Sequence, residues 1–158
     1  MFHSAHPYFH FLRLWLTVLA LLVAWPAQAS TFTDHGDGTV SDSATSLMWD
    51  KCSWGQTSSD LTCATGSATT HPWAAALGVA VTANTANYKG HNDWRLPNRL
   101  ELASLVKLDT YNPAIDPAFP NTPSNSYWSS TLYTPYPANA WVVYFLSLIH
   151  ISEPTRPY

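Results

Sequence analysis

The sequence has few charged residues, and acids outnumber bases. Charged side chains make up 11% of the 158 residues, and five bases face nine acids between residues 30 and 145. Nucleic-acid binders and polybasic membrane-surface modules need clustered Lys and Arg. The shortage of bases therefore argues against nucleic acid, against attachment to an anionic membrane surface, and against a sulfated polyanion as the partner.

The sequence also lacks a hydrophobic run long enough to cross a bilayer comfortably. The run Leu14–Trp25 has the length of a signal-peptide core and follows the weakly basic leader Met1–Arg13. The small residues of Ala27–Ala29 then suit signal peptidase. We expect a signal peptide at residues 1–29 and a mature chain from Ser30 that is secreted, periplasmic or on the cell surface, without membrane insertion after cleavage. An uncleaved anchor is the alternative, but no basic stop-transfer cluster follows.

Cysteine is scarce as well, since Cys52 and Cys63 are the only two. In an exported protein such a pair forms a disulfide by default. Closing this short loop stabilises the fold by about 2–3 kcal/mol in the chain-entropy model. A structural zinc site needs four ligands, and His71 is the only further candidate nearby. We therefore predict a Cys52–Cys63 disulfide and no structural metal.

The mature chain begins with patterns typical of short strands. Residues 32–40 are extended around an Asp37-Gly38 pair, which favours a tight hairpin. A turn at residues 42–45 and a strand at 47–49 follow. Residues 52–70 are rich in Ser, Thr and Gly, which predicts a loop.

A first helix is expected from Thr70 as N-cap, with Pro72 in its first turn, to about Ala83. Its apolar face would carry side chains at helical spacing, namely Trp73, Leu77 and Ala80 or Val81.

A second helix is expected after residues 94–97. Asn98 as N-cap and Glu101 three residues later resemble a capping box. The apolar residues that would continue this helix are Leu102, Leu105, Val106 and Leu108. Arg95 and Asn98 are better explained as holding this loop and capping the helix than as touching a ligand.

The rest of the chain reads as a loop followed by two strands. Repeated prolines in residues 111–126 exclude a helix or a central strand. Aromatic and β-branched residues at 127–131 and 140–145 predict strands. The order of strands, two helices and strands favours one α+β domain, and the 116 residues from 30 to 145 suffice for one modest core.

Aromatic side chains are dense near the end of this domain. A pyranose packs its C–H face on an indole or phenol ring, while flanking amides satisfy its hydroxyls. The candidate carbohydrate-binding residues are Tyr133, Tyr136, Trp128, Trp141 and Asn139. Tyr133 and Tyr136, on a Pro-rich loop, are the best surface candidates. The alternative is that Trp128 and Trp141, together with Trp94, fill the core.

Catalytic and calcium-binding patterns are weak. The histidines His35, His71 and His91 can be combined on paper with nearby acids, but any chain of this size offers such combinations. We expect no catalytic residues. Asp34 and Asp37 miss the spacing of a calcium loop and suit a hairpin turn instead. The stretch 92–94, Asn-Asp-Trp, resembles a lectin triplet only in shuffled order.

Four stretches together resemble the Lcl C-terminal domain family of bacteria, which is known as a domain of unknown function. They are "FTDHGDGTVSDSATSLMWDKCSWGQT", "HPWAAAL", "GHNDWRLPNRLELASLV" and "YNPAIDPAFPNTPSNSYWSSTLY…AWVVYF". The resemblance covers residues 32–145. It implies a secreted or surface-exposed domain with a fold similar to C-type lectins and formylglycine-generating enzymes. It also implies kinship with collagen-like adhesins that bind host polysaccharides.

The end of the sequence departs from this family. Residues 146–156 read LSLIHISEPTR, which resembles the translation of an adapter used in short-read library preparation. Family members usually continue through a glycine turn into further aromatic strands. We therefore expect residues 146–158 to be a non-native tail, and the C-type-lectin-like domain at 30–145 to lack its last strands.

The resulting hypothesis is a non-catalytic extracellular or periplasmic binding or adhesion module, with a polysaccharide as its partner. The alternative is a structural or protein-interaction module of the bacterial envelope without a glycan ligand. An oxidase related to formylglycine-generating enzymes would need a reactive cysteine pair, whereas a structural disulfide already explains Cys52 and Cys63.

Overall fold

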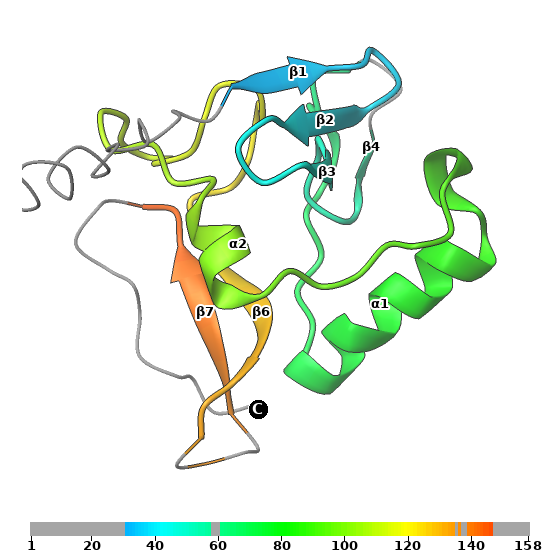
Figure 1. The fold of residues 1–158 in the computed structure, drawn as a ribbon, viewed down its shortest axis with the longest axis vertical. Coiled ribbons are helices and arrows are strands. Elements are labelled where there is room, and N and C mark those ends of the chain that lie inside the picture. The colour runs from blue at the N-terminus through cyan, green and yellow to red at the C-terminus, as the bar shows by residue number, and fades with distance from the viewer. Residues whose placement is uncertain (1–30, 58–60, 135, 137–138, 147–158) are drawn as a thin grey trace, which may run out of the picture.

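The computed structural model describes residues 31–57, 61–134, 136 and 139–146. The expected signal peptide and almost all of the expected tail therefore lie outside the described residues. Short strands open and close the described chain and two α-helices lie between them, which confirms the α+β class (Figure 1). The likeness to C-type lectins stays a prediction.

The strands form three small antiparallel sheets. The first has the order β1 (Phe32–Asp34), β2 (Thr39–Asp42) and β3 (Leu47–Asp50). The second pairs β4 (Gln56–Thr57) with β5 (Thr65–Gly66), and the third pairs β6 (Ser126–Leu132) with β7 (Ala140–Tyr144). The last two strands match the sequence prediction to within a residue at each end. The helices are α1 (Trp73–Thr85) and α2 (Arg99–Ala103), with a 3₁₀ turn η1 (Tyr88–Gly90) between them.

The β1–β2 hairpin is confirmed, and its aspartates are used by the turn. Asp34 Oδ1 accepts from the backbone N of Gly36 at 3.0 Å, and Asp37 Oδ1 accepts from the N of Thr39 at 2.8 Å. Gly36 has a φ of 75°, which an L side chain rarely adopts. These bonds give both aspartates a structural role, as the sequence predicts.

The disulfide between Cys52 and Cys63 is present, with 5.3 Å between the two Cα atoms. It lies within residues 52–70, which the sequence predicts to be a loop throughout. That prediction is partly wrong, because β4 pairs with β5, and β5 follows Cys63. The strands were hard to foresee because each has only two residues. Gln56 reinforces the segment by donating from Nε2 to the carbonyl oxygens of Cys63 and Asn121, both at 3.0 Å.

Helix α1 differs from the prediction at its start and on its buried face. Pro72, not Thr70, is the N-cap, and the helix ends at Thr85. Of the residues predicted to face inward, Leu77 and Val81 are 37% and 65% exposed, whereas Trp73 and the alternative Ala80 are half-buried. The fully buried residues of the helix are Ala76 and Ala83.

Anchors at both ends of α1 explain this orientation. Trp73 Nε1 donates to the Ser129 carbonyl oxygen at 3.0 Å. Near the other end, Asn84 Nδ2 donates to the Trp94 carbonyl oxygen at 2.8 Å and Asn84 Oδ1 accepts from the Trp94 N at 2.7 Å. These bonds set how the helix is rotated, and its own periodicity does not encode them.

Helix α2 is short, and its predicted capping box is confirmed. Asn98 Oδ1 accepts from the Glu101 N at 2.9 Å, and Glu101 Oε2 accepts from the Asn98 N at 2.8 Å. Both carboxylate oxygens of Glu101 also accept from Arg95, at 2.7 and 2.8 Å. Arg95 and Asn98 thus hold the loop and cap the helix, as expected.

The predicted extension of this helix through Leu108 is wrong. The chain leaves the helix after Ala103 and forms an isolated bridge between Val106 and Ile115, so Leu108 is 72% exposed. Leu105 still reaches the core from beyond the helix end.

The core lies where α2, the sheets and the Pro-rich loop meet. Its buried residues are Val40, Leu102, Leu105, Ile115, Phe119, Val143 and Phe145. The interpretation of Trp94, Trp128 and Trp141 as core is wrong for all three, because each is only half-buried. Their indole or backbone polar groups are held at the margin of the core, and the loop residues Ile115 and Phe119 take the central places.

The capping box gives a first prediction. Asn98→Ala leaves the Glu101 N without its acceptor, so we expect the free energy of unfolding in urea to fall by about 1 kcal/mol. Asn92→Ala is the matched control, since Asn92 is exposed and no hydrogen bond from its side chain occurs among the described residues. Equal stability of the two variants would contradict the structural role of the cap.

The same site predicts an acid-dependent loss of stability. Hydrogen bonds from Arg95 hold the pKa of Glu101 below its ordinary value of 4.5. The folded state therefore gains stability that is complete above that ordinary value and disappears as the pH falls through the lowered pKa. We expect Glu101→Gln to flatten this part of the stability–pH curve measured by urea unfolding. Asn92→Ala, which changes no titratable group and lies at an exposed position, should reproduce the parent curve.

Candidate functional site

The β6–β7 hairpin carries all four aromatic residues predicted to bind a ligand. Tyr133 follows β6 and Asn139 precedes β7. The Tyr133 N donates to the Asn139 carbonyl oxygen at 2.9 Å, and the Asn139 N donates to the Tyr136 carbonyl oxygen at 2.8 Å. A third bond joins the Tyr136 N to the Tyr133 carbonyl oxygen at 2.9 Å. The backbone therefore holds the described residues of the hairpin end in a fixed conformation.

Three aromatic rings meet at this hairpin end. The rings of Tyr133 and Tyr136 are stacked with centroids 6.0 Å apart and an interplanar angle of 26°. Tyr133 also meets Trp141 edge to face at 5.5 Å. Tyr136 is 64% exposed, so much of its ring surface is open to solvent. We call Tyr133, Tyr136, Trp141 and the neighbouring Arg99 the hairpin cluster.

Arg99 joins the cluster from α2. Its guanidinium carbon lies 4.7 Å from the centre of the Trp141 ring, a cation–π arrangement. The Arg99 N donates to Thr131 Oγ1 at 2.9 Å, which fixes the start of α2 on β6. Among the described residues Arg99 forms no ion pair. Its donors are therefore not taken by a carboxylate in that part of the chain.

Arg99 was missed at the level of sequence. The positions three and four residues away on the chain hold Leu96, Arg95, Leu102 and Ala103, so no carboxylate could pair with it along the helix. The lack of a carboxylate partner at helical spacing is the one sign in the sequence that Arg99 has another role, and it is weak. Its approach to Trp141 depends on how α2 packs against β7.

Trp128 does not belong to the cluster. It pairs with Val142 across the two strands, and Trp141 precedes Val142 on β7. Because side chains alternate along a strand, Trp128 and Trp141 lie on opposite faces of the hairpin. Trp128 Nε1 donates to the His71 carbonyl oxygen at 2.8 Å, beside the start of α1. Asn139 joins the cluster through its backbone bonds. The structure thus brings together Tyr133, Tyr136, Trp141 and Asn139, but not Trp128.

The histidines do not gather into one site. His35 Nε2 lies 2.7 Å from Ser41 Oγ, and His71 Nε2 lies 2.9 Å from Thr69 Oγ1. His91 contacts the ring of Trp94 edge to face at 5.8 Å. Within the described ranges, no group of three or more His, Cys, Asp or Glu side chains is placed to hold a metal ion. No helix in that part of the chain has the length and apolar character needed to span a membrane.

Fold and site together define a small α+β domain stapled by one disulfide, with an aromatic cluster on a hairpin. Residues 38–155 match the family model of the Lcl C-terminal domain, and the chain belongs to that family. The family resemblance in the sequence is therefore confirmed. No curated protein and no solved structure gives a significant match.

Proposed function

We propose that the protein is a non-catalytic binding or adhesion module for extracellular or periplasmic carbohydrate. The observation that carries this proposal is the exposed Tyr136 ring stacked on Tyr133. A solvent-facing phenol supported from behind by a second ring is a platform for the C–H face of a pyranose. Residues 1–29, the expected signal peptide, support the extracellular or periplasmic location.

Polar groups beside the platform supply the second requirement of a sugar site. Sugar hydroxyls need donors and acceptors next to the stacked face. The Arg99 guanidinium offers several N–H donors beside Trp141, and none is taken by a carboxylate among the described residues. Tyr133 and Tyr136 add phenolic oxygens. Nothing in this arrangement activates a nucleophile, so the chemistry it supports is recognition.

The aromatic platform yields a direct test. Tyr136→Ala removes the exposed ring while leaving the backbone bonds of Tyr133 and Asn139 possible. Screening the purified protein on an array of neutral and acidic glycans should identify a ligand, and the variant should bind it at least about tenfold more weakly, the loss expected for one stacking contact. The thermal midpoint should stay close to that of the parent protein, because Tyr136 is mostly exposed.

Tyr111→Ala is the matched control. Tyr111 is 72% exposed, compared with 64% for Tyr136, and lies in the Pro-rich loop. Its ring is not among those that Tyr133, Tyr136 or Trp141 contact in the described part of the chain. Glycan binding that survives Tyr111→Ala and disappears with Tyr136→Ala supports the proposal. If the parent protein binds no glycan on the array, the result would instead favour a structural or protein-interaction module of the envelope.

A further inference from the structure

The pairing of β6 with β7 is interrupted opposite Trp141. The regular pairs on either side of the interruption are Trp128–Val142 and Leu132–Ala140. Residues 129–131 of β6 therefore face Trp141 alone on β7. A β-bulge of this kind bends its strand and redirects the side chains around it. Ser129 Oγ donates to the Trp141 carbonyl oxygen at 2.8 Å, so the two strands stay joined at the bulge.

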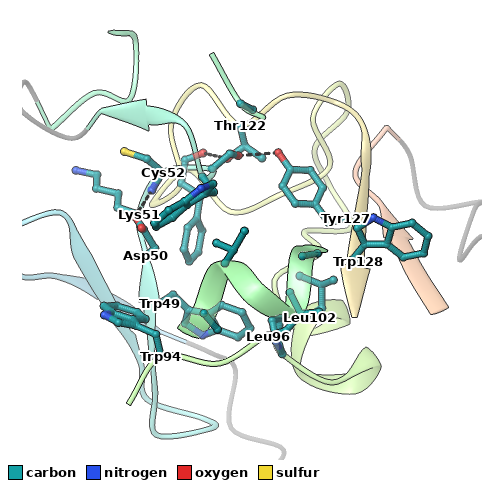
Figure 2. A pocket seen from close by; sticks show the side chains of 18 of the residues that line it. Trp49, Asp50, Lys51, Cys52, Trp94, Leu96, Leu102, Thr122, Tyr127 and Trp128 are labelled. Carbon is teal, nitrogen blue, oxygen red and sulfur yellow. Dashed lines mark hydrogen bonds between the residues drawn. The ribbon is translucent and has the colours of Figure 1, made fainter. Parts of the chain in front are cut away.

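The bulge also holds the start of α2. The Ser130 N donates to the Pro97 carbonyl oxygen at 2.8 Å, and the Arg99 N donates to Thr131 Oγ1 at 2.9 Å. Further along the helix, Leu102 is buried in the core. Figure 2 shows Leu102 among the residues that line a cleft beside the core. Helix α2 is thus fixed at its start by the bulge and three residues later by the core.

This attachment places Arg99 over the indole of Trp141. The guanidinium carbon lies 4.7 Å from the centre of the ring, and both side chains are half-buried. A cation is attracted to the face of an indole, and the attraction grows as the pair is removed from water. In the described part of the chain no carboxylate pairs with Arg99. Its interaction with Trp141 therefore has no competing ion pair there.

The Trp141 ring is the first of three rings in contact. Tyr133 meets Trp141 at an interplanar angle of 82°, and Tyr136 is stacked on Tyr133 at 26°. Edge-to-face and offset-stacked pairs are the arrangements that aromatic rings favour. Among the described rings, Tyr136 contacts Tyr133 and not Trp141. The orientation of Trp141 therefore reaches the exposed Tyr136 ring through Tyr133.

We propose that Arg99 is a positioning residue of the hairpin cluster. Its guanidinium holds the Trp141 ring in place. Trp141 in turn orients Tyr133, which presents the Tyr136 ring to solvent. This role is separate from any hydrogen bond that Arg99 donates to a sugar. For ligand binding the inference rests on the proposed carbohydrate function, whereas the orientation of the rings is a property of the ligand-free protein. The two can therefore be tested separately.

The ligand-free test is an NMR measurement on isotope-labelled tyrosine rings. Tyr133→Phe and Tyr136→Phe assign the two sets of ring signals. Arg99→Met keeps the length of the side chain but removes its charge. We expect this variant to move both sets of signals toward those of the exposed Tyr111, because the Trp141 ring is no longer held. Arg99→Lys keeps a cation and should leave the signals close to their parent positions.

Lys107→Met is the charge-matched control. Lys107 lies over no aromatic ring in the described chain, so its loss should leave the tyrosine signals unchanged. In a Trp141→Leu background, Arg99→Met should cause no further change, because the ring through which Arg99 acts is gone. Cooperative unfolding in urea is required of every variant, so that loss of folding is recognised.

Glycan binding provides the second readout. For a glycan that binds the parent protein, Arg99→Met should weaken binding about two- to fivefold, the loss expected for one cation–π contact. Arg99→Lys should retain most of the affinity. If no glycan binds the parent protein, the carbohydrate proposal fails, and the tyrosine spectra still decide the role of Arg99.

Two results would overturn the positioning role. One is a folded Arg99→Met variant whose Tyr133 and Tyr136 signals stay at their parent positions. The other is an equally large effect of Arg99→Met with and without the Trp141 ring, because Arg99 would then not act through Trp141.

Discussion

The network of Arg95, Asn98 and Glu101 is the constraint on which most of the fold depends. Helix α2 has only five residues, far below the length at which an isolated helix is stable in water. The reciprocal capping bonds and the bidentate ion pair supply the stabilisation that so short a helix lacks. With its start fixed, the helix places Leu102 in the core and Arg99 over Trp141. Core and candidate site are therefore oriented by the same turn of helix.

This dependence matters because no sheet in the described chain is large enough to hold itself together. The sheets have two or three strands each, and such small sheets need packing against other elements. Here the packing comes partly from irregular chain. Ile115 and Phe119 lie in the Pro-rich loop, and Phe119 meets Phe32 of β1 with ring centroids 5.3 Å apart. The loop thus joins the first sheet to the last hairpin, and the disulfide restrains the segment between them.

Features encoded by neighbouring residues could be predicted from the sequence. The Asp-Gly hairpin, the capping box, the cysteine pair and strands β6 and β7 all depend on local patterns, and each is found. The rotation of α1 could not be predicted in this way, because Leu77 and Val81 form as good an apolar stripe as Ala76 and Ala83. Distant hydrogen bonds to Ser129 and Trp94 decide between the two faces. The prediction that Trp94, Trp128 and Trp141 lie in the core was wrong for a related reason. An indole needs a hydrogen-bond partner as well as apolar contact.

The residues of the candidate site likewise include some that the sequence predicts and one that it does not. Tyr133, Tyr136 and Trp141 were found because aromatic density near a turn is visible in the sequence, whereas Arg99 enters through tertiary packing alone. The alternation of side chains along β6 and β7 then separates Trp141 from Trp128. Trp141 meets the ring of Tyr133 on one face of the hairpin, and Trp128 reaches the start of α1 from the other. The two tryptophans therefore have different neighbours although both lie on the same pair of strands, because one step along a strand reverses the direction of the side chain.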